Sequence, residues 1–169
     1  MTIQHNLDAF PGWQGRLQLA YEFDRAKTRL VSNQGIAPLK VQRSFYPEAE
    51  TICHNTILHT AGGVVGGDGL QIEVDLGRQA RATITTAAAA KIYGGNDRIA
   101  VQSIVQNIGV DACLEWLPQE TIVFDQAIFH QRLRVNLATL DRHLHRYSER
   151  STEQQFDRCP HRFWLLPPW

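Results

Sequence analysis

The sequence predicts an all-β fold, mainly strands with one or two short helices, built as layered antiparallel sheets. Apolar and polar residues alternate in short runs over the first 138 residues, which is the period of half-buried strands. Glycine, proline, asparagine and aspartate residues separate these runs and mark turns. Several short strands punctuated in this way are typical of a layered β domain.

The strand signals follow one another from residue 16 to residue 137. Leu17, Leu19 and Tyr21 share one face of the first run, and the last run alternates apolar residues with basic and amide residues. The sequence shows no internal repeat. The predicted strands are 16–21, 39–43, 52–59, 70–76, 81–86, 99–108, 112–117, 121–124 and 129–137.

One segment has the composition of a helix. Thr86 to Tyr93 contains four consecutive alanines and is followed by Gly94-Gly95, which would end a helix. The segment is barely two turns long, so a helix here would need tertiary support.

Bulk composition limits the partners and the compartment. The chain has 169 residues, enough for one domain, with 17 basic and 17 acidic residues, so no net field attracts nucleic acid or an anionic membrane. No apolar run approaches the roughly 20 residues of a membrane span, and the N-terminus lacks the features of a signal peptide. Three widely spaced cysteines do not indicate a disulfide framework. A cytoplasmic protein with reduced thiols is expected.

A glycine-rich segment, 60–69, is the most unusual local feature of the chain. A Walker loop would end in Gly-Lys-Ser/Thr, whereas these glycines lead to Asp68, an anion that repels phosphate. A Rossmann loop would be followed by a helix, but 70–76 alternates like a strand. A tight turn that leads into a strand is therefore favoured over a nucleotide site. The glycines are Gly62, Gly63, Gly66, Gly67 and Gly69.

Cys53, His54 and His59 are candidate ligands for nickel, zinc or copper, because thiolate and imidazole suit these metals. If 52–59 is a strand, Cys53 and His59 share one face and His54 lies on the other, which disfavours a compact three-ligand site. Partly exposed strand residues are the simpler interpretation, and a small metal-binding β module is the alternative.

Glu115, Glu120 and Asp125 cluster in sequence around Trp116. Paired carboxylates perform acid–base chemistry when their environments separate their pKa values. Pro118 lies between the two glutamates, however, and favours a solvated loop. No Gly-x-Ser-x-Gly turn positions a nucleophile, and no enzyme activity is predicted.

The chain changes character after residue 138. Alternation ceases, and 139–169 is first charged and polar and then rich in proline and tryptophan. The sequence therefore predicts a β domain over 1–138 and a poorly ordered tail over 139–169.

Three stretches, 43–68, 83–93 and 112–127, resemble the urease accessory protein family UreD, also called UreH. The segment Gly-Gly-Val-Val-Gly-Gly-Asp after a Leu-His strand is fairly specific, and Leu-Glu-Trp-Leu-Pro-Gln-Glu is highly specific. Both motifs occur in the order and spacing of the family. The resemblance covers about residues 13 to 138.

The resemblance implies a scaffold for nickel insertion into urease, acting with UreF, UreG and urease apoprotein, and a predominantly β fold with a couple of short helices. No stably bound cofactor is expected, and Ni²⁺ would pass transiently through an internal, water-filled passage. The resemblance makes Glu115, Glu120 and Asp125 candidates for lining this passage. It makes the turn of Gly62, Gly63, Gly66, Gly67 and Asp68 a candidate partner-binding or structural element.

Two features depart from the family pattern. Ala87 to Ala90 replace a stretch that usually contains proline or glycine, and the resemblance stops at about residue 138 although family members continue well beyond it. A truncated or frameshifted member is therefore expected. Missing strands would leave unpaired edges and exposed core, so the isolated chain is expected to be insoluble or partly unfolded and unable to mature urease.

Overall fold

The computed structural model describes residues 11–94, 97–138, 152–156 and 163–165. These residues form strands and turns without a helix, so none of their segments is a helix that could cross a membrane. The mainly β prediction is confirmed. The strands are β1 Gln14–Phe23, β2 Thr28–Ile36, β3 Leu39–Val41, β4 Ile52–His59, β5 Val64–Val65, β6 Gly69–Leu76, β7 Arg81–Thr86, β8 Ala90–Tyr93, β9 Ile99–Ile108, β10 Cys113–Leu117, β11 Thr121–Val123, β12 Ile128–Leu137, β13 Thr152–Phe156 and β14 Phe163–Leu165.

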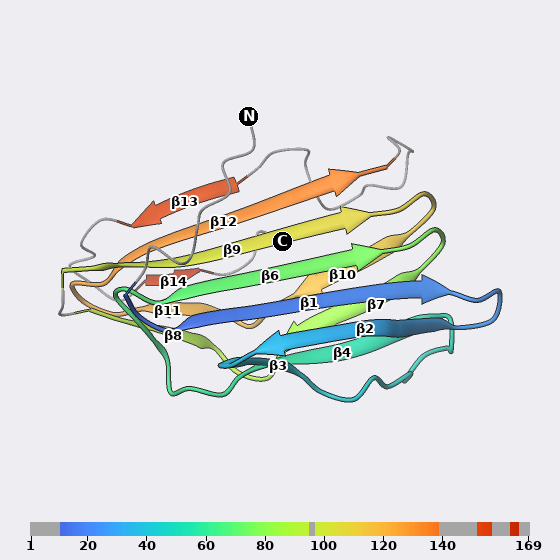
Figure 1. Ribbon diagram of the computed structural model, residues 1–169, viewed down its shortest axis with the longest axis horizontal. Helices are drawn as coiled ribbons and strands as arrows, with labels where there is room; N and C mark the ends of the chain where they lie inside the picture. The colour runs from blue at the N-terminus through green and yellow to red at the C-terminus, as the bar shows by residue number, and fades with distance from the viewer. Residues whose placement is uncertain (1–10, 95–96, 139–151, 157–162, 166–169) are drawn as a thin grey trace.

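The strands form three sheets, which the chain visits in a fixed cycle (Figure 1). We name them sheet A, ordered β13-β12-β9-β6-β1-β2, sheet B, ordered β10-β7-β4-β3, and sheet C, ordered β14-β11-β8-β5. The chain passes from B to C to A three times, as β4-β5-β6, β7-β8-β9 and β10-β11-β12. Each coil pairs in parallel with the coil before it. The described chain is thus a three-coil β-solenoid.

The solenoid contains a structural repeat that the sequence does not reveal. Ile52, Arg81 and Cys113 occupy one row across sheet B, so one coil takes about 30 residues. The inward-facing row three positions later holds Asn55, Ile84 and Trp116. At equivalent positions, the side chains of the three coils point in the same direction but belong to different residue types. The repeat is therefore not visible in the sequence.

The predicted antiparallel arrangement is wrong for most strand pairs. Antiparallel pairing occurs at β1–β2, β3–β4, β11–β14 and β12–β13, while the pairs between coils and the β1–β6 pair are parallel. Alternation of apolar residues reports which face is buried and carries no information about strand direction. The direction follows from the corners, which return the chain to sheet B after each coil.

The three N-terminal strands close the first coil. β1 lies parallel to β6, and β2 folds back on β1 with a register shift between Ala20 and Tyr21. β3 then pairs antiparallel with β4. A bulge and a change of direction limit further pairing at this end of a stack of parallel strands.

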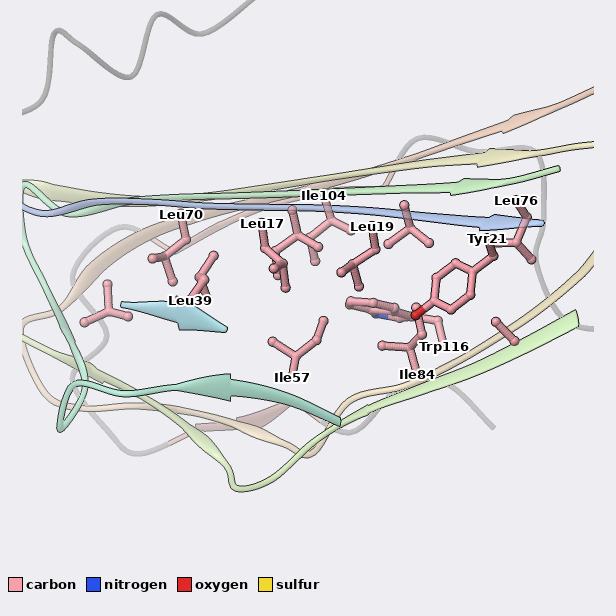
Figure 2. Packing of buried hydrophobic residues seen from close by; sticks show 14 of the residues in the cluster. Leu17, Leu19, Tyr21, Leu39, Ile57, Leu70, Leu76, Ile84, Ile104 and Trp116 are labelled. Carbon is pink, nitrogen blue, oxygen red and sulfur yellow. The ribbon is translucent and has the colours of Figure 1, made fainter. Parts of the chain in front are cut away.

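The core lies between sheet A on one side and sheets B and C on the other (Figure 2). Leu17, Leu19 and Tyr21 point inward from β1, as their spacing predicts, and are at most 1% exposed. Side chains of sheet B, including Ile84 and Trp116, face them across the core. Other core members are Leu39, Cys53, Ile57, Leu70, Ile72, Val74, Leu76, Ile92, Ile104, Val123 and Phe129.

The predicted helix over 86–93 is wrong. Thr86 ends β7, and Ala90–Tyr93 forms β8, which pairs in parallel with β5 and β11. The backbone N–H of Ala90 donates to the carbonyl of Glu120 at 2.9 Å. The alanines favour a helix only weakly over so short a segment, and hydrogen bonds to two flanking strands outweigh that preference.

The predicted tail over 139–169 lies mostly outside the described residues. The described parts of it are β13, which pairs with β12, and β14, which pairs with β11. The third coil ends with β12 at Leu137, and the division into a domain over 1–138 and a tail stays a prediction.

Candidate functional site

The glycine-rich segment forms the corner between sheets C and A in the first coil, and Asp68 holds this corner together. Its Oδ1 accepts the backbone N–H of Trp13 at 2.8 Å, and its Oδ2 accepts the backbone N–H of Val65 at 3.0 Å. The Asp68 residue is only 8% exposed. The carboxylate therefore ties the turn to the start of β1, 55 residues earlier in the chain.

The glycines in this corner have different roles. Gly67 adopts a φ of +98°, donates its N–H to Ile99 and accepts the N–H of Gly12. A Cβ on Gly63 would meet the ring of Tyr93 and lie 2.8 Å from the carbonyl oxygen of Lys91, whereas a Cβ on Gly62 would meet nothing within 4 Å. Gly66 is buried. A side chain at Gly63 would therefore clash with its neighbours, and one at Gly67 would be strained by the positive φ, whereas Gly62 has room for a side chain.

The same corner recurs in the next two coils, where it is packed tightly. Gly94 follows β8 and lies against the backbone of residues 125–127, which follow β11. The rings of Tyr93 and Phe124 stack with centroids 4.8 Å apart. The stacked corners therefore form a ridge with partly exposed apolar side chains, including Val65 and Tyr93.

The structure separates the proposed cysteine and histidine ligands on β4. Cys53 is fully buried, while His54 faces outward, with its Nε2 3.5 Å from Oε1 of Glu48 and its ring 5.4 Å from that of Phe45. His59 places its Nδ1 3.1 Å from the carbonyl oxygen of Ala61. Among the described residues, no group of three cysteine, histidine or carboxylate side chains is placed to hold a metal.

The three carboxylates of the third coil also lie apart. Glu115 is exposed on the outer face of β10, where it accepts the hydroxyl of Thr83 at 2.9 Å. Glu120 is in the turn between β10 and β11, and Asp125 is exposed at the corner after β11. The buried Trp116 follows Glu115 directly, so strand alternation places the Glu115 side chain outside.

A buried polar cluster around Asn55 was not identified from the sequence. Asn55 is fully buried; its Oδ1 accepts the hydroxyl of Tyr21 at 2.9 Å, and its Nδ2 donates to the carbonyl of Gln42 and to Ser44 Oγ, both at 3.1 Å. The amide thereby fixes segment 42–44 against β4. The available signal was an amide residue at an inward position of the predicted strand 52–59.

We expect Asn55→Ala to lower the free energy of unfolding by about 2–4 kcal/mol, because it leaves buried partners without hydrogen bonds. Asn33→Ala on the exposed face of β2 is the matched control and is expected to change stability by less than about 0.5 kcal/mol. Urea unfolding followed by tryptophan fluorescence measures both. Equal effects for the two variants would contradict a structural role for Asn55.

The two tyrosines near this cluster predict a loss of stability at high pH. Burial, and then the neighbouring Cys53, raise the pKa of Tyr46 to about 12, and burial raises the pKa of Tyr21 further. Both phenols stay protonated in the folded chain while those of the unfolded chain ionise near pH 10. The contribution of both is therefore fully present below about pH 10; that of Tyr46 is lost as the pH rises through about 12, and that of Tyr21, whose pKa is raised more, continues to decline above that pH. Tyr21→Phe should flatten this decline in unfolding free energy; an unchanged slope would contradict it.

An amide ladder crosses the outer face of sheet A. Asn136 donates to Asn107 at 2.7 Å, and Asn107 donates to Asp75 at 2.6 Å, so each of the three coils contributes one residue. The ladder borders a shallow hollow of about 500 Å³ at the ends of β1, β6, β9 and β12. Such ladders stabilise stacked parallel strands, which gives this row a structural role.

The fold thus defines the class of molecule as a parallel β-solenoid. Its glycine-rich motif has a structural role, because it forms a corner between two sheets. Comparison with known proteins then assigns the chain to a family. The model of the UreD urease accessory protein family matches residues 14–141. The chain therefore belongs to the UreD family.

Individual relatives support this assignment. The urease accessory protein UreD of Nostoc punctiforme is 59% identical over 128 residues, which cover 76% of this chain and 46% of that protein. UreD of Thermosynechococcus vestitus is 52% identical over 75% of this chain and 46% of its own length. UreD of Janthinobacterium is 40% identical over 85% of this chain and 48% of its own length. The chain spans about half the length of the curated relatives it matches.

Proposed function

We propose that this solenoid is a cytoplasmic scaffold for urease maturation and that it helps to deliver nickel to urease apoprotein in a complex with UreF and UreG. The observation that carries the proposal is the family match over residues 14–141, which includes all three coils. The role is binding and positioning, with no catalytic step. The corner held by Asp68 supports a scaffold role, because it fixes the orientation of the outer face of sheet A relative to that of sheet C.

Nickel in this proposal is cargo that binds weakly and moves on. Two amide residues, Asn55 and Gln106, are buried between the sheets at 0% and 2% exposure, so the interior contains polar groups. The amide oxygen of a buried glutamine is a group that can bind a passing cation. We assign Gln106 as a candidate passage residue ahead of Glu115 and Asp125, which are exposed on the outside.

A chimera tests the proposal in a protein that has the full length of a curated relative. Residues 14–141 of this chain replace the matched segment of the Nostoc punctiforme relative, and the tagged chimera is co-expressed with UreF, UreG and urease apoprotein. We expect UreF and the apoprotein to co-purify with the chimera as they do with the unaltered relative. A soluble chimera that retains neither protein would contradict the scaffold role.

Gln106→Leu in the same chimera tests the cargo assignment. We expect this variant to keep its soluble yield and its partners but to lower urease activation, because leucine fills the site without offering an oxygen. Glu115→Gln is the matched control on the outer face and should leave activation unchanged. Unchanged activation with Gln106→Leu would remove Gln106 from the nickel path.

A further inference from the structure

We propose that the hollow at the ends of β1, β6, β9 and β12 is a docking site for an arginine side chain that a protein partner presents. The arginine supplies a hydrogen-bond donor that the chain itself lacks at Ala20, and it neutralises a carboxylate beside that position. The four strands point toward the same end of the molecule (Figure 1). This inference rests on the proposed function, because it names the chemistry of one partner-binding surface on the scaffold.

Rows of side chains cross the outer face of sheet A, and in two of them a donor on β1 binds an acceptor on β6. Nε of Arg16 donates to Oε1 of Gln71 at 3.1 Å. In the row beside it, Nε2 of Gln18 donates to Oε2 of Glu73 at 2.9 Å. The members of each pair lie directly opposite each other in the register of β1 and β6. On this face, β1 therefore provides the donors for the acceptors of β6.

The next row lacks such a donor. Ala20 lies opposite Asp75, and its methyl group has no hydrogen to donate. Asp75 accepts Nδ2 of Asn107 with its Oδ1 at 2.6 Å, while its Oδ2 accepts no hydrogen bond from a residue that the structure describes. The Asp75 residue is exposed. Its second carboxylate oxygen is thus left for a donor from water or from another polypeptide.

The charge of the hollow is negative. Its described lining includes two carboxylates, one of them that of Glu22, and no lysine, arginine or histidine. Arg29 lies opposite Glu22 on β2 but pairs with Asp24, with 2.7 Å between Nε and Oδ2. Arg78, just after the end of β6, lies 3.9 Å from Oδ2 of Asp111. The hollow is therefore complementary to a positively charged group of a partner.

The shape of the hollow suits a long side chain. Ala20, Gly77 and Gly109 have little or no side chain, and Leu76 and Ile108 contribute apolar surface to the lining. The volume of about 500 Å³ is within the range of ligand-binding clefts. Arginine fits this combination, because its methylene stem packs on apolar surface. Its planar guanidinium binds a carboxylate through two parallel hydrogen bonds.

Ala20→Gln supplies the missing donor from within the chain. In the chimera described above, the new side chain stands opposite Asp75 as Gln18 stands opposite Glu73, so it should bind the carboxylate and fill part of the hollow. Its thermal stability should equal or exceed that of the unsubstituted chimera. Co-expressed with UreF, UreG and urease apoprotein, the soluble variant is expected to retain about tenfold less of the partner that docks in the hollow.

Asp75→Asn tests the contribution of charge, because it removes the charge and leaves an oxygen for Asn107. We expect a similar loss of the retained partner. Glu73→Gln makes the same charge change in the neighbouring row, where Gln18 already supplies the donor, and should leave retention unchanged. If Ala20→Gln and Asp75→Asn retain every partner as well as the unsubstituted chimera does, the docking proposal is wrong and the scaffold role stands.

A photo-reactive amino acid in place of Arg78, whose side chain is 74% exposed beside the hollow, identifies the occupant. We expect a cross-link to a partner peptide that contains arginine, and we expect Ala20→Gln to abolish it. A cross-link to a segment without arginine, to another part of the same chimera or to a second copy would overturn the proposal. An unsubstituted chimera that retains no partner at all would contradict the scaffold role, and this inference with it.

Discussion

Gly94→Ala is expected to lower the free energy of unfolding by about 3 kcal/mol or more. The added Cβ would overlap the carbonyl oxygen of Asp125 and lie 2.5 Å from the backbone nitrogen of Ala127. Both obstacles are backbone atoms, so relief would require the second and third coils to separate. Because this contact lies where coils pack against each other, the loss should appear in urea unfolding as a lower midpoint with little change in slope.

Gly62→Ala is the control for this experiment. A Cβ at Gly62 would meet no atom within 4 Å, and the residue is exposed. The change is therefore expected to alter stability by less than about 0.5 kcal/mol, or to raise it slightly by reducing the entropy of the unfolded chain. If Gly62→Ala were as damaging as Gly94→Ala, the stacked-corner geometry would be incorrect.

Asp68→Ala is the second large effect, with an expected loss of about 3 kcal/mol. The carboxylate accepts two backbone N–H groups in a site that is 8% exposed, and hydrogen bonds to a charged group contribute about 1.5–3 kcal/mol each. Asp68→Asn retains one acceptor oxygen and should fall between the wild type and Asp68→Ala. Thermal or urea unfolding of the three proteins gives the ranking, and an alanine variant as stable as the wild type would contradict it.

The same pair of substitutions separates the two roles proposed for the glycine-rich turn. In the chimera, a purely structural Asp68 predicts that Asp68→Asn lowers the amount of soluble protein and leaves UreF retention per molecule unchanged. A role in partner binding predicts reduced retention per molecule at equal soluble yield. The hydrogen bonds to Trp13 and Val65 favour the first outcome.

The faces of the strands could be predicted from the sequence because strand alternation is a local property. Leu17, Leu19 and Tyr21 are buried together as expected, and β4 has the bounds predicted for it. The outward position of Glu115 follows from the same rule, since Trp116 beside it is buried. These features depend only on residues a few positions apart.

Strand direction and the coil repeat could not be predicted, because they depend on contacts between residues about 30 or more positions apart. Tyr93 is in a strand because β5 and β11 flank it, although its own segment resembles a short helix. Similarly, the sequence indicates a turn at Asp68 but not that its carboxylate binds Trp13, 55 residues away. Asn55 resembles any other polar strand residue until its partners from β1 and segment 42–44 are known.

The most direct test of the central claim is the nickel content of urease matured in cells that contain the chimera as their only UreD-family protein. A functional scaffold segment predicts urease with nickel content and specific activity close to those obtained with the unaltered Nostoc punctiforme relative. Urease that remains nickel-free, although the chimera is soluble and present at an equal level, would contradict the claim that these three coils serve in urease maturation.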